Sequence, residues 1–241
     1  MLRDEFSKLY PALFKNANLH VAIIRALFQK KSGLTRQQLL EMLRTSSGGS
    51  VTIALDELEQ SGFVAAYFPF GKKVRDKVWR LIDKYSIFYL QFIEEKVIQR
   101  EHNWLNLMDS QGYKTWGGFA FENICLRHLP QIKNALGISG VYTEASTFYK
   151  KGTDTEPGAQ IDLVLDRKDR IINLFEIKFY NDTFHFGAAE MAALRSKQQI
   201  FSESTQTRKY IAWVLLTTFG LKNKGILDTV LTMDDLFGTK N

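Results

Sequence analysis

Two apolar runs in the second half of the chain carry charged residues that an ordinary buried strand avoids. Asp162 interrupts the run QIDLVLDR, and Glu176 and Lys178 interrupt IINLFEIKFY. Side chains two residues apart on a strand point to the same face, so Glu176 and Lys178 should lie together. With Asp162 on the paired strand, two carboxylates and one ammonium group converge.

This set of groups suits metal-assisted chemistry on a phosphate. Carboxylate oxygens are the ligands that Mg²⁺ and Mn²⁺ prefer. A divalent cation would also relieve the repulsion between two acids in an apolar sheet. We therefore predict that Asp162 and Glu176 bind Mg²⁺ or Mn²⁺, and that Lys178 activates the attacking water or stabilises charge on the phosphate.

A further acid, Glu122, stands among apolar residues in the helix-like segment WGGFAFENICLRH, residues 116–128. A buried carboxylate is costly unless it meets a cation or a metal ion. Glu122 is therefore a candidate for the same site. The alternative is that Glu122 lies on the solvent side of an amphipathic helix.

The segments around these residues predict an α+β domain with a mixed sheet. Residues 141–150 alternate as a strand does, and the two apolar runs joined by the turn Lys168-Asp169 predict a buried hairpin. A helix over about 188–201 and a strand over 209–220 complete the order helix, three strands, helix, strand.

The first half predicts helices and then a hairpin. Apolar residues at helical spacing mark helices over 19–31, 35–44 and 50–60. Thr35 and Gln38 have the spacing of a capping box, and Gly62 can end the third helix in a left-handed conformation. The runs FVAAYFPF and VWRLID flank a Gly-Lys-Lys tip, which is typical of a hairpin. Residues 83–108 predict a helical connector whose aromatic stripe favours core packing over base stacking.

Composition excludes several classes of protein. Of 241 residues, 45% are hydrophobic and 24% are charged, and no run reaches the ~18 apolar residues of a membrane span. No signal peptide begins the chain. The single cysteine, Cys125, excludes an intramolecular disulfide, so we expect a cytoplasmic protein without a membrane partner.

Positive charge is concentrated in the first half. Residues 1–100 hold 16 Lys and Arg against 10 Asp and Glu, whereas residues 101–241 hold 16 of each. A basic half joined to a neutral half suggests a polyanion-binding module attached to a second module.

The order of three helices and a two-stranded ribbon over residues 19–82 resembles a winged helix-turn-helix domain, as does the junction Leu58, Gly62, Phe63, Val64. The resemblance implies DNA contact through the third helix and the wing. The third helix has an acidic polar face, which leaves protein docking as the alternative. Basic residues in the wing and at the second helix give the predicted DNA contacts: Arg36, Lys72, Lys73, Arg75 and Lys77.

Asp162, 13 intervening residues and then Glu176-x-Lys178 resemble the signature of the PD-(D/E)XK nuclease-like superfamily. The resemblance implies a restriction-endonuclease-like fold and a metal-dependent endonuclease, with the Ile177 carbonyl as a further metal ligand. It also implies a catalytic role for Glu122 on the preceding helix. Supporting roles fall to Gln160, Lys197 and Gln198.

Together with GxAFEN, TTxGLKxN and a final MDDLF, these features resemble the C-terminal region of bacterial and archaeal-type AAA ATPases. The sequence lacks G-x-x-x-x-G-K-[ST], so we expect no ATP site in this chain and a P-loop ATPase domain upstream or in trans. The predicted division is a winged helix over 1–84, a helical connector over 85–115 and a nuclease-like domain over 116–241. Two functions remain open. One is a nuclease, and the other is a non-catalytic DNA- or protein-binding module that regulates an ATPase.

Overall fold

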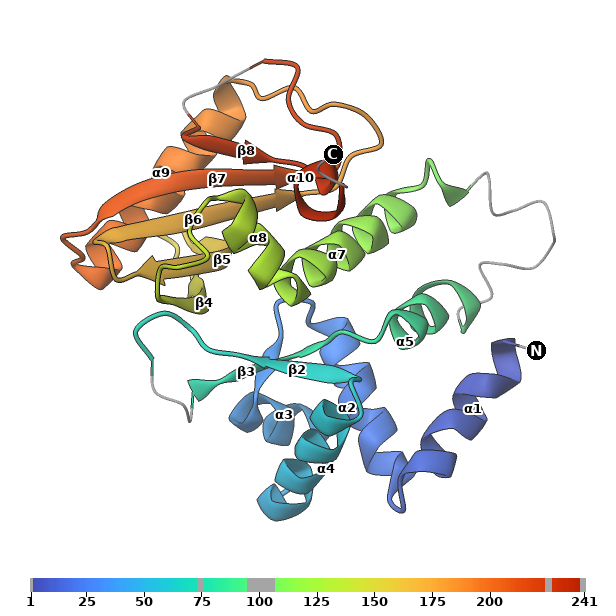
Figure 1. Ribbon diagram of the computed structural model, residues 1–241. Helices are drawn as coiled ribbons and strands as arrows, with labels where there is room; N and C mark the ends of the chain where they lie inside the picture. Colours follow the sequence, from blue (N-terminus) through green and yellow to red (C-terminus); the bar gives the residue numbers. More distant parts are fainter. Residues whose placement is uncertain (1, 73–75, 95–106, 224–226, 239–241) are drawn as a thin grey trace. The chain divides into compact units, whose positions relative to one another are not determined.

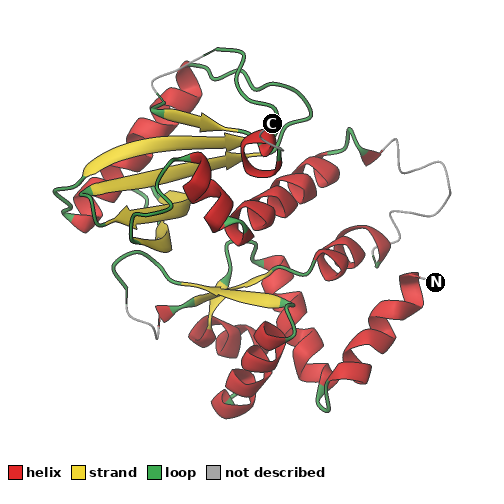
Figure 2. Ribbon diagram, viewed as in Figure 1, coloured by secondary structure: helices red, strands yellow, loops and turns green. Residues whose placement is uncertain are grey.

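The computed structural model describes residues 2–72, 76–94, 107–223 and 227–238 (Figure 1). The chain forms two compact units. The first unit comprises Met1–Tyr67 and Lys73–Ala120, and the second comprises Phe68–Lys72 and Phe121–Asn241. Both units combine helices with a sheet, which confirms the α+β class (Figure 2).

The first unit combines helices with a three-stranded antiparallel sheet of strand order β1-β3-β2. Its strands are β1 (Leu34–Thr35), β2 (Val64–Tyr67) and β3 (Val78–Leu81). Its helical elements are α1 (Leu2–Leu13), α2 (Ala17–Gln29), α3 (Arg36–Leu43), α4 (Gly48–Gln60), α5 (Lys84–Phe88), the π-helical turn η2 (Tyr89–Ile93) and the first part of α7 (Gln111–Arg127).

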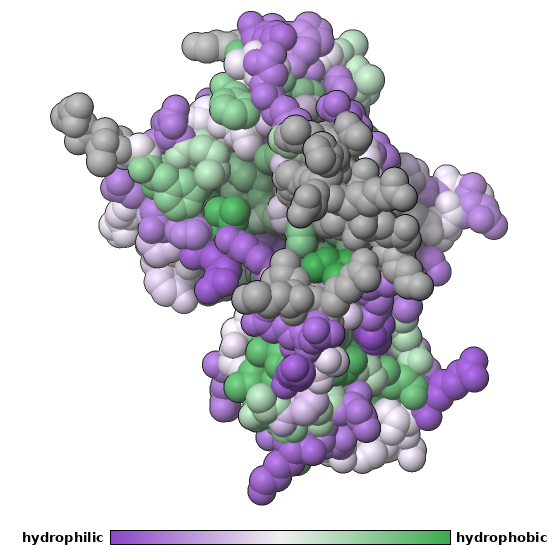
Figure 3. Space-filling view, turned by 90° about the vertical axis from the view of Figure 1, so that its right-hand side faces the viewer, coloured by the Kyte–Doolittle hydropathy of each residue, from purple (hydrophilic) through white to green (hydrophobic). Residues whose placement is uncertain are grey.

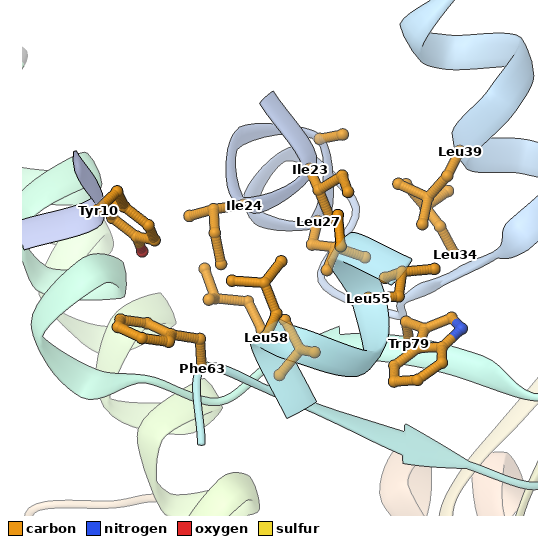
Figure 4. Close-up of a cluster of buried hydrophobic side chains, with 14 of the residues drawn as sticks. Tyr10, Ile23, Ile24, Leu27, Leu34, Leu39, Leu55, Leu58, Phe63 and Trp79 are labelled. Carbon is orange, nitrogen blue, oxygen red and sulfur yellow. The ribbon is translucent and has the colours of Figure 1, made fainter. Parts of the chain in front are cut away.

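The core of the first unit lies where these helices meet the sheet. Figure 4 shows Ile23, Leu55 and Leu58 of the two central helices pointing toward one another, with Tyr10 at one end and Trp79 at the other. All five side chains are almost completely buried. Burial of this apolar surface is the main force that stabilises the unit.

Local signals in the sequence set the ends of the helices. Thr35 Oγ1 accepts a hydrogen bond from the Gln38 amide at 3.2 Å, and Gln38 Oε1 accepts one from the Thr35 amide at 2.9 Å, so the predicted capping box is present. Gly62 has φ +75°, the left-handed conformation expected after α4. The sequence did not predict α1 or the two-residue strand β1.

The predicted hairpin is shorter than expected. Strand β2 pairs with β3 only as far as Tyr67, and the next residues belong to the second unit. Thr147 donates its amide hydrogen to the Phe68 carbonyl at 3.1 Å and accepts from the Phe70 amide at 2.7 Å. Pro69, which lies between them, has no amide hydrogen with which to continue a ladder.

The predicted connector is not one continuous helix in its described part. Helix α5 passes into η2, where the Glu94 amide donates to the Tyr89 carbonyl at 2.9 Å, and residues 95–106 lie outside the described residues. The aromatic stripe packs within the first unit, since the Tyr89 and Phe6 rings stack 4.2 Å apart. Helix α7 starts at Gln111, so the glycines before Phe119 lie inside it rather than before it.

The second unit contains a mixed five-stranded sheet of order β4-β5-β6-β7-β8. Strand β5 is antiparallel to both of its neighbours, β4 and β6, whereas β6, β7 and β8 run parallel. The strands are β4 (Thr143–Lys150), β5 (Ala159–Arg167), β6 (Ile171–Lys178), β7 (Tyr210–Thr217) and β8 (Thr229–Leu231). The helices are the end of α7, α8 (Leu129–Ala135), α9 (Ala188–Thr205) and α10 (Met233–Phe237).

Helices lie on both faces of this sheet, with α8 in front of it and α9 behind it in Figure 1. Phe201 of α9 belongs to one buried cluster with Ile172 and Leu174 of β6 and with Trp213 and Leu215 of β7. Because side chains alternate along a strand, the even-numbered residues of β6 and the odd-numbered residues of β7 face α9. Glu176 and Lys178 continue this face.

Within the described residues, no helix is both long enough and apolar enough to cross a membrane. In the coloured part of the surface in Figure 3, hydrophilic side chains surround smaller apolar areas. Scattered apolar side chains of this kind are usual on protein surfaces.

The capping box should contribute measurably to the stability of the first unit. We expect Thr35→Ala to lower the free energy of unfolding by about 1 kcal/mol, because the Gln38 amide loses its acceptor. Urea denaturation of Thr35→Ala and of the neighbouring surface variant Gln37→Ala tests this. Among the described residues, the Gln37 side chain makes one exposed hydrogen bond, to Glu41. Equal losses in the two variants would contradict the prediction.

Candidate active site

The sheet of the second unit divides near Asp162. The ladder between β5 and β6 ends at the pair Leu163–Phe175. Beyond that pair β5 stays with β4 as far as Ala159, whereas β6 stays with β7 as far as Lys178. We call the opening between the two diverging strands the fork. Continuing the register of the ladder places Asp162 opposite Glu176 at the start of the fork.

A β-bulge accompanies this divergence. Ser146 of β4 pairs with Val164, and Phe148 pairs with Ile161, so Thr147 alone faces two residues of β5. Those two residues are Asp162 and Leu163. A bulge bends its strand and redirects a side chain, and such features are frequent beside active sites.

The Asp162 side chain occupies the fork where a backbone bond would otherwise form. Its Oδ2 accepts a hydrogen bond from the Ile177 amide at 3.3 Å. The N–H and C=O of one strand residue point to the same side, so the Ile177 carbonyl also faces the fork. That carbonyl is the further ligand expected from the sequence resemblance.

Glu176 is held by two lysines. Its Oε1 lies 2.8 Å from Lys178 Nζ, and its Oε2 lies 2.6 Å from Lys197 Nζ of α9. The Glu176 side chain is 8% exposed, compared with 42% for Lys178 and 25% for Lys197. Both oxygens of a buried carboxylate are thus paired with ammonium groups, which offsets the cost of its burial.

The acids of the fork repel one another. Burial, and then the charges of Glu122 and Glu176, raise the pKa of Asp162 to about 7. Burial also acts to raise the pKa of Glu176, but Lys178 and Lys197 outweigh it and hold that pKa below its usual value. Burial acts to lower the pKa of Lys178, yet the Glu176 carboxylate outweighs it and raises that pKa.

Glu122 is therefore close enough to act on this site, since its charge affects Asp162 more than any other charged group does. It also contributes to the raised pKa of the Cys125 thiol, for which burial is the main cause. Cys125 is completely buried, and its raised pKa keeps the thiol protonated.

The donor set fits a divalent cation. No group of three or more His, Cys, Asp and Glu able to hold a metal occurs in the part of the chain that the structure describes. Mg²⁺, however, usually takes one or two carboxylates and completes its shell with water and substrate oxygens. Asp162, Glu176 and the Ile177 carbonyl supply such a set, and a cation there would relieve the repulsion that raises the pKa of Asp162.

Of the three predicted supporting residues, Gln198 and Gln160 have contacts with residues other than the acids of the fork. Gln198 accepts a hydrogen bond from Trp213 Nε1 at 2.8 Å and so fixes the packing of α9 on β7. Gln160 pairs with Tyr149 across the two strands on the β4 side of the fork. Of the three, only Lys197 has a contact with the acids among the described hydrogen bonds and ion pairs.

Sequence reasoning missed two neighbours of Lys178. Thr217 of β7 is its register partner in the parallel ladder. Tyr180 follows it on the same face of the chain, and Lys178 acts on the Tyr180 pKa, which burial raises overall. Alternation through residues 176, 178 and 180 could have identified Tyr180, whereas Thr217 needed the register of β7.

The predicted DNA-contacting residues that the structure describes belong to both units. Arg36 Nε donates to Thr52 Oγ1 at 2.7 Å and so links α3 to α4, and the Lys77 ammonium lies 4.1 Å from the centre of the Trp79 ring. Lys72 is exposed and belongs to the second unit. Lys73 and Arg75 lie outside the described residues.

Comparison with known proteins adds little. No protein-family model matches the chain, and no curated protein matches its sequence. The crystal structure of protein VC1899 from Vibrio cholerae is similar over 89% of this chain and 43% of that protein, with 11% identity and a TM-score of 0.27. The chain thus spans less than half of that protein's length, and a similarity this low carries no argument.

The pKa of Asp162 predicts how stability depends on pH. Its folded value of about 7 exceeds the ordinary value of 3.8, so the folded chain binds this proton more tightly than the unfolded chain does. Without divalent cations, the stability from this group is complete below pH ~4 and is lost as the pH rises through 7. One pKa unit corresponds to about 1.4 kcal/mol, so the loss amounts to a few kcal/mol.

Urea denaturation in EDTA at about pH 4.5 and pH 8, for wild type and Asp162→Asn, measures this effect. Wild type should lose more stability than Asp162→Asn over that range. Equal losses in both proteins would show that burial and repulsion do not act on Asp162 as described.

Lys197 should compete with a cation for Glu176. We expect Lys197→Met to bind Mn²⁺ about tenfold more tightly at pH 8, a gain of about 1.4 kcal/mol, because a positive charge is removed and Oε2 is freed. Isothermal titration calorimetry measures it. Lys209→Met is the matched control, since Lys209 pairs with Asp166 elsewhere on the sheet. Unchanged or weaker binding in Lys197→Met would contradict this competition.

Proposed function

We propose that the second unit is a nuclease of the PD-(D/E)XK type that cleaves phosphodiester bonds with Mg²⁺ or Mn²⁺. The fork carries this proposal, because it brings Asp162, Glu176 and Lys178 together where the two strands diverge. The order of strands and flanking helices agrees with the restriction-endonuclease-like arrangement expected from the sequence.

Each residue of the fork has a chemical task in this proposal. Asp162, Glu176 and the Ile177 carbonyl would hold the cation, which when bound supplies Lewis acidity toward the phosphate. Lys178 orients the attacking water and stabilises negative charge on the phosphate. Its raised pKa keeps it an ammonium, which favours charge stabilisation over proton abstraction. Glu122 assists from α7, and Lys197 keeps Glu176 ionised.

The reaction is hydrolysis of a phosphodiester. The water oxygen bonds to phosphorus and gives up a proton to solvent, the bond from phosphorus to one ester oxygen breaks, and the leaving oxygen takes up a proton from solvent. Negative charge grows on the phosphate oxygens in the transition state, which is where the Lys178 ammonium stabilises it.

For the first unit we propose a winged helix that binds DNA. The order α2, β1, α3, α4, β2, β3 supports it, with Arg36 at the start of α3. The acidic residues of α4 count less against DNA binding than the sequence suggests, because two of them have partners within the unit. Glu57 Oε2 is hydrogen-bonded to His20 Nε2 at 2.7 Å, and Glu59 Oε1 accepts from the Ala66 amide at 3.3 Å.

The alternative function is a non-catalytic DNA- or protein-binding module of an ATPase. Both Glu176 oxygens are already paired with lysines, and residues 101–241 have no excess of positive charge. In both cases we propose that the chain works as the C-terminal portion of an AAA-type ATPase, with the P-loop domain preceding it or in a separate chain.

Cleavage assays distinguish the two functions. Wild type should cut supercoiled plasmid or single-stranded circular DNA in Mg²⁺ or Mn²⁺. Asp162→Ala, Glu176→Ala and Lys178→Met should each lower the rate by about 100-fold or more, because each removes a cation ligand or the charge-stabilising group.

Asp182→Ala serves as the control, since Asp182 is an exposed acid of the same unit. It should cut at the wild-type rate. Equal residual cutting by wild type and Glu176→Ala on every substrate would remove the nuclease proposal and favour the non-catalytic module.

A further inference from the structure

A buried hydroxyl on β7, the strand next to β6, lacks a hydrogen-bond partner among the described residues. Thr217 at the end of β7 is completely buried, and its Oγ1 has no partner among the described residues. Leaving a buried hydroxyl unpaired destabilises the fold, because the group loses its hydrogen bonds to water without a replacement. Valine has nearly the same shape and would fill this position without that cost, so the hydroxyl needs an explanation.

The register of the sheet places this hydroxyl next to Lys178. Thr217 is the cross-strand partner of Lys178 in the parallel ladder between β6 and β7. Both side chains lie on the face that continues Leu174 and Leu215 toward the end of the strands. Neighbouring strands are about 4.8 Å apart, so the side chains of Lys178 and Thr217 start from adjacent positions on the same face.

Lys178 needs a second acceptor if Glu176 binds a cation. Its ammonium now points to Glu176 Oε1 at 2.8 Å, and Lys197 occupies the other oxygen. A divalent cation on Glu176 requires at least one of these oxygens and repels both ammonium groups. The ammonium that leaves Oε1 still has three N–H groups to donate, so it needs another acceptor.

We infer that Thr217 is a positioning residue whose hydroxyl accepts a hydrogen bond from Lys178 when Glu176 turns to a divalent cation. Lys178 thus has two partners, the Glu176 carboxylate without the cation and the Thr217 hydroxyl with it. The hydroxyl thus offers the ammonium a replacement acceptor in the state in which the cation has taken its place on Glu176. This inference rests on the cation site proposed above and assigns a new role within it.

The variant Thr217→Val removes the hydroxyl and keeps the shape of the side chain. Without divalent cations, its melting temperature should rise by about 2–4 °C, because an unpaired polar group is lost. With Mn²⁺ the effect of the hydroxyl reverses, and wild type is favoured over Thr217→Val. Calorimetry at pH 8 should show about fivefold weaker Mn²⁺ binding to Thr217→Val than to wild type, and Thr217→Ser should restore binding to within about twofold.

A double-mutant cycle shows whether the effect passes through Lys178. In the Lys178→Met background, Thr217→Val should leave Mn²⁺ affinity unchanged, because the donor is already absent. A side chain with a purely structural role would lower the affinity equally in both backgrounds.

The outcomes separate this inference from the proposed function. If wild type and Asp162→Asn both fail to bind Mn²⁺, the cation site and the role of Thr217 fall together. If wild type binds Mn²⁺ and Thr217→Val binds it equally tightly, only the role of Thr217 is overturned. A lower melting temperature of Thr217→Val without cations would also overturn it, since the hydroxyl would then already have a partner.

Discussion

Repulsion between acids at the fork is the constraint on which the account depends. Asp162 and Glu176 lie close together where β5 and β6 diverge in an apolar sheet, and Glu122 adds a third negative charge nearby. Like charges so placed in a poorly solvated site must be protonated or neutralised by cations. The described structure uses both solutions, since burial and repulsion raise the pKa of Asp162 to about 7 while Lys178 and Lys197 neutralise Glu176.

This balance links the fold to the proposed chemistry. The lysines stabilise the folded chain without a metal ion, yet they occupy the oxygens that a cation would need. A cation must therefore displace at least one ammonium group, and the neighbouring Thr217 hydroxyl offers a displaced lysine a new acceptor. The same side chains that maintain the fold in one state can then serve catalysis in the other.

The sequence predicted the parts of this site that depend on local pattern. Alternation placed Glu176 and Lys178 on one face, and the two apolar runs formed the expected antiparallel hairpin. It could not predict the β-bulge at Asp162, because a bulge depends on how β4 pairs with β5. Lys197 and Gln198 were predicted as a pair, but adjacent helical residues point about 100° apart, so Gln198 contacts Trp213 instead. The sequence predicted a longer hairpin and did not indicate that Phe68–Lys72 belongs to the second unit.

The central claim is that Asp162, Glu176 and the Ile177 carbonyl bind one divalent cation in the fork. The most direct test is a crystal structure of the protein soaked in Mn²⁺, with diffraction data collected near the manganese absorption edge. The account predicts one anomalous peak at about 2.0–2.2 Å from an oxygen of each of the three residues, with Lys178 Nζ moved away from Glu176 Oε1. No anomalous signal at the fork, with both lysines still paired to Glu176, would contradict it.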